Sequence, residues 1–63
     1  MKIKPNEKYG EFCKRLRYAC KLTQGQFAEE VGIAKSSVVK YEKGDRPSFI
    51  NQRKIDDYAE KVK

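Results

Sequence analysis

A chain of 63 residues is long enough for one small hydrophobic core, which excludes a large multidomain enzyme and predicts a single domain over residues 1–63. Its 15 basic against nine acidic residues give a net charge of +6, which favours a polyanionic partner such as nucleic acid, although an ordinary soluble surface explains the charge about as well. The composition is 38% hydrophobic, with no apolar run of membrane-spanning length and no basic-then-apolar leader, so we expect neither disorder, a membrane span nor a signal peptide.

Side chains that carry chemistry are few and scattered. The chain has no His, its acids are spread along charged faces, and it lacks a Gly-rich phosphate loop or a nucleophile motif. On a helix, Cys13 and Cys20 would lie on one face but roughly 10 Å apart along the axis, too far for a disulfide. Two cysteines without His do not complete a zinc site. We therefore predict no catalysis, no metal and no cofactor, and two small buried thiols that suit a reducing cytoplasm.

In chain order, the first predicted element is an amphipathic helix over residues 6–21, for which Pro5-Asn6 supplies the start. The segment before it, residues 1–5, is expected to form a basic arm. The apolar stripe of the helix is formed by residues that recur at helical spacing: Tyr9, Phe12, Cys13, Leu16, Ala19 and Cys20.

Two capping signals predict a short second helix over residues 24–31. Thr23, followed three residues later by Gln26, has the pattern of a capping box, in which each side chain binds the backbone N–H of the other residue. Leu22 and Phe27 occupy the two positions of a hydrophobic staple, which fixes the direction in which the chain enters the helix.

A third helix is predicted over residues 35–43, with Gly44 as its stop. An advance of about 100° per residue places Val38 and Tyr41 on one side, where we expect them in the core. The opposite side carries no acidic residue and consists of Lys35, Ser36, Val39, Lys40 and Lys43. The two adjacent valines are therefore expected to have different roles, one in the core and one on the surface.

The run Asp45-Arg46-Pro47-Ser48 predicts a turn that opens the last helix, which we expect over residues 48–61. The apolar positions of this segment are Ile55, Tyr58, Ala59 and Val62, with Phe49 and Ile50 ahead of them. Gln52 and Arg53 interrupt the stripe, so it is thin. Because no strand pattern appears, the sequence predicts an all-α fold, a compact bundle of four or five short helices that ends in the helical segment 48–63.

The second and third helices, linked by three residues that begin with Gly32, predict a helix-turn-helix over residues 23–43. Residues 22–48 read LTQGQFAEEVGIAKSSVVKYEKGDRPS. This run resembles the phage repressor and Cro type of helix-turn-helix, the lambda-repressor-like or XRE family, in its LTQ opening, its Phe-Ala pair, its turn glycine and its final RPS. The resemblance extends back to Leu16-Arg17 and covers about residues 12–50.

The resemblance implies a regulator of transcription, commonly a repressor, that binds double-stranded DNA and reads the major groove with helix 35–43. The side chains that would contact base edges are Lys35, Ser36, Val39 and Lys40. Those that would contact phosphates are Gln24, Lys43, Arg46 and Ser48. Arg17 and Glu42 would form an ion pair that ties the first helix to the third.

Each of these residues also has a purely structural explanation. The lysines could be ordinary solvated side chains, and Ser36 could substitute for a poor cap at the start of its helix. Val39 could be an isolated surface apolar residue or part of a contact with another protein. Gln24 could simply favour a helix start, and Arg46 could pair with Asp45.

One short helix reads few base pairs, so the resemblance implies a homodimer, at least on DNA, on a palindromic operator with half-sites about one turn, roughly 34 Å, apart. Either the last helix dimerises weakly, or the chain is the DNA-binding part of a longer regulator. We expect a cytoplasmic regulator of a bacterium, phage or mobile element, without an affinity for membranes. The alternatives are an antitoxin or adaptor that uses the same fold to bind a protein partner, and a nonspecific nucleic-acid binder.

Overall fold

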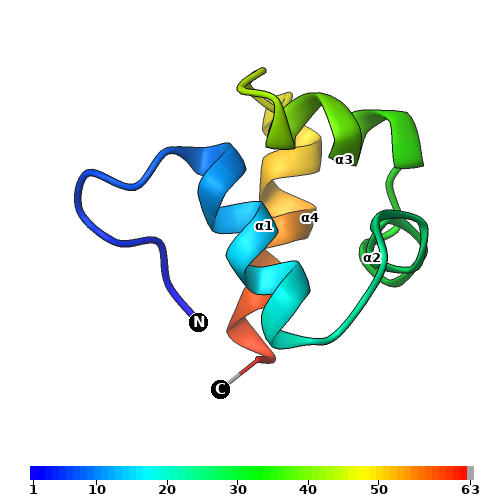
Figure 1. The fold of residues 1–63 in the computed structure, drawn as a ribbon, viewed down its shortest axis with the longest axis horizontal. Coiled ribbons are helices and arrows are strands. Elements are labelled where there is room, and N and C mark those ends of the chain that lie inside the picture. Colours follow the sequence, from blue (N-terminus) through cyan, green and yellow to red (C-terminus); the bar gives the residue numbers. More distant parts are fainter. Residues whose placement is uncertain (63) are drawn as a thin grey trace.

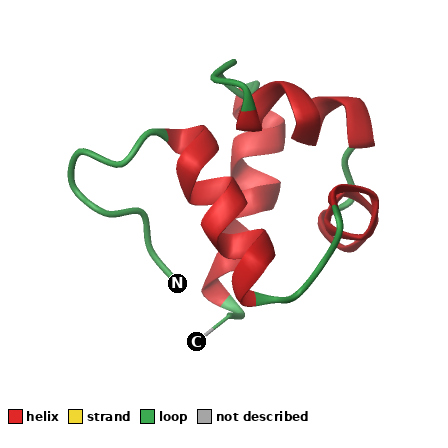
Figure 2. Cartoon of the chain, viewed as in Figure 1, coloured by secondary structure: helices red, strands yellow, loops and turns green. Residues whose placement is uncertain are grey.

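The computed structural model describes residues 1–62, which form four helices joined by short links. The helices are α1 (Tyr9–Ala19), α2 (Gln24–Val31), α3 (Lys35–Glu42) and α4 (Phe49–Glu60). In Figure 1, α1 and α4 run in the same direction, α3 lies across the end where both begin, and α2 is seen nearly end-on beside them. The described residues contain no strand (Figure 2), so the predicted all-α fold is confirmed, with four helices. No helix among residues 1–62 is both long and apolar enough to cross a membrane.

All four helices contribute to one hydrophobic core. Its buried side chains are Phe12, Cys13, Leu16, Phe27, Ala28, Val38, Tyr41, Ile55 and Ala59. The stripe predicted for α1 is wrong at its end, because Ala19 is exposed whereas Arg17 is buried. The reason is the position of α3, which packs against the side of α1 that carries Gly10 and Arg17 and so rotates the buried face toward them.

The links between helices use the predicted capping residues. At the start of α2, the Thr23 side chain accepts a hydrogen bond from the Gln26 N–H (3.1 Å), and the Gln26 side chain accepts one from the Thr23 N–H (3.0 Å). Gly32 ends α2 in the left-handed conformation with φ of 89°, which glycine adopts without a steric penalty. Ser48 caps α4, with its Oγ accepting from the Asn51 N–H at 3.3 Å.

The start of α1 differs from the prediction, because the helix begins at Tyr9 and not at residue 6. Pro5-Asn6 instead forms the two central positions of a tight turn, closed by a hydrogen bond from the Glu7 N–H to the Lys4 carbonyl (3.1 Å). Asn6 has φ of 69°, and proline followed by a residue with positive φ is the pattern of a type II turn.

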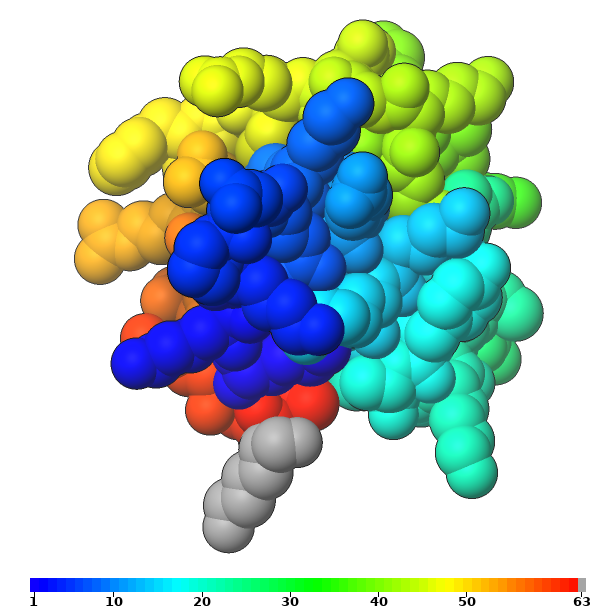
Figure 3. Space-filling model, turned by 60° about the vertical axis from the view of Figure 1, so that its left-hand side comes forward, coloured from blue at the N-terminus to red at the C-terminus, as the bar shows by residue number. Residues whose placement is uncertain are grey.

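The residues before this turn, which were expected to form a basic arm, fold back along α1 and α4. The Arg15 guanidinium donates to the Lys2 carbonyl oxygen at 2.7 Å. The Met1 amino group donates to the carbonyl oxygens of Ala59 (2.7 Å) and Val62 (2.6 Å), which lie at the C-terminal end of α4. Figure 3 shows the dark blue beginning of the chain against the red end of α4, and in Figure 1 this end lies away from α3.

The two cysteines are unpaired and differ in exposure, which gives a test of the core. Cys13 is 1% exposed, and burial raises the pKa of its thiol to about 12, whereas Cys20 is only partly buried. Because the thiolate is the reactive form, we expect iodoacetamide near neutral pH to modify Cys20 first and to reach Cys13 only in urea. Mass spectrometry of digested protein measures both rates, and equal rates in the folded chain would contradict the packing of Cys13.

Candidate nucleic-acid interface

Helix α3 has one buried and one outward side, as its sequence predicts. Val38 is 1% and Tyr41 6% exposed, and the Tyr41 hydroxyl accepts a hydrogen bond from the Asn51 Nδ2 at 2.7 Å. Val39 is only partly buried. The other residues predicted for this side are exposed, namely Lys35, Ser36 and Lys40 in α3 and Lys43 directly after it.

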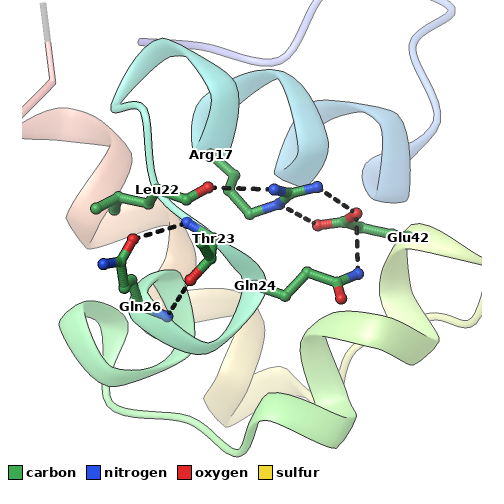
Figure 4. A network of polar contacts seen from close by, with 6 residues as sticks. All are labelled: Arg17, Leu22, Thr23, Gln24, Gln26 and Glu42. Carbon is green, nitrogen blue, oxygen red and sulfur yellow. Dashed lines mark hydrogen bonds and ion pairs between the residues drawn. The ribbon is translucent and has the colours of Figure 1, made fainter.

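The single acidic residue of α3 is turned away from this outward side and is bound by a cation. Arg17 Nε donates to Glu42 Oε2 at 2.8 Å, and Arg17 Nη2 donates to Glu42 Oε1 at 3.0 Å (Figure 4). The two side chains are 11% and 7% exposed, and Arg17 Nη1 also donates to the Leu22 carbonyl at 3.1 Å. The carboxylate raises the pKa of the guanidinium, which stays charged. Because this pair is neutral as a whole, the outward side of α3 retains the charge of its lysines.

Gln24, the first residue of α2, joins the same polar network. Its Nε2 donates to Glu42 Oε1 at 3.3 Å, as Figure 4 shows. An amide nitrogen has two hydrogens, so one remains for a further acceptor outside the molecule. The N–H groups of the first turn of α2 give this end of the helix a partial positive charge. Gln24 therefore has a structural contact and a free donor at once.

The start of α3 lies beside this end of α2. A Cβ atom added to Gly25 would be 3.7 Å from Lys35 Cδ, so the Lys35 stem passes over the Gly25 backbone. The residue before α3 is Ala34, and no side chain within residues 1–62 caps the helix there. Ser36 and its hydroxyl are thus exposed and not used as a cap.

Lys43 and Arg46 both lie at the other end of α3. Both line a groove of about 750 Å³ that lies between the α3–α4 link and the beginning of α1. Within residues 1–62, Arg46 forms no ion pair with Asp45. The purely structural explanation for Arg46, a pair with Asp45, is therefore not observed. Ser48 does not line this groove, and its oxygen already caps α4, although the hydroxyl hydrogen is still free to be donated.

Two residues that position α3 were not identified from the sequence. Gly10 lies where α1 crosses α3, because a Cβ atom there would be 1.9 Å from the Tyr41 carbonyl oxygen. A glycine inside an amphipathic helix was a signal for such close contact. Lys54 donates from Nζ to the Gly32 carbonyl at 3.1 Å and so ties α4 to the turn before α3. No local pattern predicts this contact, since the two residues are 22 apart in the chain.

The residues predicted to contact DNA are therefore grouped around one helix. Four lie on the outward side of α3, namely Lys35, Ser36, Val39 and Lys40, while Gln24 flanks its first turn and Lys43 and Arg46 follow its last. Such a surface offers cationic donors, a hydroxyl and one apolar contact, the set of groups that duplex DNA accepts at phosphates, base edges and thymine methyl groups.

Comparison with known proteins bears on this arrangement. A protein-family model described as helix-turn-helix matches residues 14–58. Comparison with curated proteins and with solved structures finds no match. The matched range contains α2 and α3 entirely, together with most of α1 and α4, and amounts to more than half of the chain.

Proposed function

The chain belongs to the helix-turn-helix family of the phage repressor and Cro type, and on this premise we propose that it recognises a specific duplex DNA sequence and represses transcription. Its family makes it a DNA-binding regulator, and such domains are not typically enzymes. The observation that carries the proposal is the outward side of α3, which bears lysines and no free acid because Glu42 is bound by Arg17.

In this proposal α3 lies in the major groove. Lys35 and Lys40 donate to guanine or phosphate oxygens, Ser36 donates or accepts at a base edge, and Val39 packs on a thymine methyl group. The phosphate contacts are made by Gln24, Lys43, Arg46 and Ser48. These contacts release counterions and provide most of the affinity, while the base contacts provide discrimination.

Two copies are needed for useful specificity. Helix α3 has eight residues, so it is about 12 Å long and spans only a few base pairs. We therefore expect a palindromic operator with half-sites about one turn, roughly 34 Å, apart, each bound by one copy in the manner of a homodimer. The same arrangement applies if the chain is the DNA-binding part of a longer regulator or if it also binds a protein partner.

Selection from random duplexes of about 30 base pairs at moderate salt tests the proposal directly. We expect enrichment of an inverted repeat with half-site centres about one turn apart. Binding of the whole pool without enrichment of any sequence would mean that α3 is an electrostatic surface only, and it would remove the proposed sequence specificity.

Lys40→Ala is expected to relax the preference at one position of the selected site. A good base contact contributes about 1–3 kcal/mol, so discrimination there should fall by roughly five- to 150-fold. Measurement of affinity for all four base pairs at each position reveals the change. The matched control is Lys61→Ala, which removes the same charge at the end of α4 that lies away from α3. A uniform loss for every sequence would make Lys40 a phosphate contact instead.

A further inference from the structure

The proposed DNA contacts leave one apolar surface of the molecule unused. Phe49 is 78% and Ile50 66% exposed, and they are the most exposed large hydrophobic side chains among residues 1–62. Both lie in the first turn of α4, where neither contributes to the core. Adjacent exposed side chains of this size point to a surface that another molecule covers.

Charged residues of both signs border this apolar pair. An open hollow of about 300 Å³ is lined by Phe49, Gln52, Arg53, Asp56 and Asp57. Asp56 already accepts a hydrogen bond from the Tyr9 hydroxyl at 2.8 Å. Within residues 1–62, Arg53 and Asp57 have no ion-pair partner, although both are exposed on the same side of α4.

We propose that this surface joins two copies of the chain on DNA. The Phe49 patch, as we define it, consists of Phe49, Ile50, Gln52, Arg53, Asp56 and Asp57. Because the patch carries unpaired charges of both signs, the same patch on a second copy offers each charge an opposite partner across a two-fold axis. Arg53 of each copy then pairs with Asp57 of the other, and each Phe49 packs against the opposite hollow. The proposal rests on the proposed function, because that function requires two copies on neighbouring half-sites.

The position of the patch suits this role. It follows α3 after the link 43–48, at the end of the molecule that carries α3, whereas Met1 and the C-terminal end of α4 lie at the other end (Figure 1). The yellow and orange segment to which it belongs projects at the left-hand edge in Figure 3, away from the green residues of α3. A second copy bound there shares no residue with the outward side of α3 and brings the C-terminal ends of the two α3 helices toward a common axis.

The size of the patch sets the expected strength of pairing. Stable interfaces bury about 800 Å² on each partner, more than two large side chains and their rim supply. Free copies are therefore expected to associate only weakly, with a dissociation constant on the order of 1 mM, and DNA completes the pair by holding both copies close together.

Charge reversal tests the pairing in the free chain. Sedimentation at concentrations up to about 1 mM should show association of the unaltered chain, monomers for Arg53→Asp and for Asp57→Arg, and association again for the double variant, in which the pair is reversed. Phe49→Ser should abolish association. All three positions are exposed, so thermal melts should change little and verify that each variant folds.

The same variants on DNA separate this proposal from the proposed function. On the selected inverted repeat, each single reversal should lower the ratio of affinity for the repeat to affinity for an isolated half-site by about tenfold, and the double variant should restore it. A ratio that is the same for all variants, with a monomeric free chain, overturns the pairing and assigns the patch to a different protein. Self-association through this charge pair without any enriched DNA sequence overturns the proposed function and leaves the pairing of copies intact.

Discussion

Gly10→Ala is expected to destabilise the fold by about 3 kcal/mol or more, at or beyond the upper end of the usual cost of overpacking. The added Cβ would lie 1.9 Å from the carbonyl oxygen and 3.0 Å from the carbonyl carbon of Tyr41. Both are backbone atoms, so no side chain can rotate away, and α1 must separate from α3. A chain of this length has a total stability of about 3–9 kcal/mol. Urea unfolding followed by circular dichroism should show a midpoint lower by about 3 M, or no folded baseline.

Gly25→Ala is the matched control, because it is the same substitution at a helical position with space. The nearest atom to its added Cβ is Lys35 Cδ at 3.7 Å, an ordinary van der Waals distance. The alanine should therefore stabilise the chain by up to about 1 kcal/mol, since glycine loses more backbone entropy on folding. If the two substitutions had similar effects, α1 and α3 would not approach each other as closely as Gly10 implies.

The parts of the fold that follow from neighbouring residues could be predicted from the sequence. The Thr23–Gln26 capping box and the Ser48 cap each connect residues three apart, so their signals are complete in a short window. That Val38 lies in the core while Val39 lies on the outward side follows from helical geometry alone. These local features determined the bounds of α2 and α3 to within one residue.

Features that depend on contacts between distant residues could not be predicted. The beginning of α1 was misplaced because Pro5-Asn6 is compatible with a helix start and with a turn, and the turn is held by the ion pair between Glu7 and Arg15. The exposure of Ala19 depends on where α3 packs, and the buried pair of Arg17 with Glu42 was implied by the family resemblance but not by the helical wheel of α1. The helical wheel describes one helix, whereas the buried face is determined by its neighbours.

The candidate site also combines features that could be predicted from neighbouring residues with features that depend on distant contacts. The outward lysines of α3 follow from periodicity, and their grouping with Gln24 follows from the resemblance to a known family. That Gln24 already binds Glu42 was not predicted, because the two residues are 18 apart and meet only when α2 packs on α3. The exposure of Phe49 also depends on tertiary structure, since the first turn of α4 extends past the core that its later residues reach.

Glu42→Ala is expected to cost about 3 kcal/mol, the lower end of the range for breaking a buried ion pair, because the guanidinium of Arg17 is still 11% exposed. The substitution leaves Arg17 with a single hydrogen bond, to the Leu22 carbonyl, beside its stacking on the Tyr18 ring at 4.6 Å, and it removes the acceptor of Gln24. Thermal unfolding should show a melting temperature lower by about 12–24 °C, since 1 kcal/mol corresponds to about 4–8 °C in a domain of this size.

Two controls distinguish the loss of the pair from the loss of a charge or of a side chain. Glu29→Ala removes an exposed acid from α2 and should change the melting temperature little. Glu42→Gln keeps the shape and one accepting oxygen, so its effect should lie between those of the other two variants. An unchanged melt for Glu42→Ala would show that the pair does not hold α1 to α3. In that case the outward side of α3 would lack negative charge only because the Glu42 side chain points away from it. Glu42→Ala should then leave the selected DNA sequence unchanged.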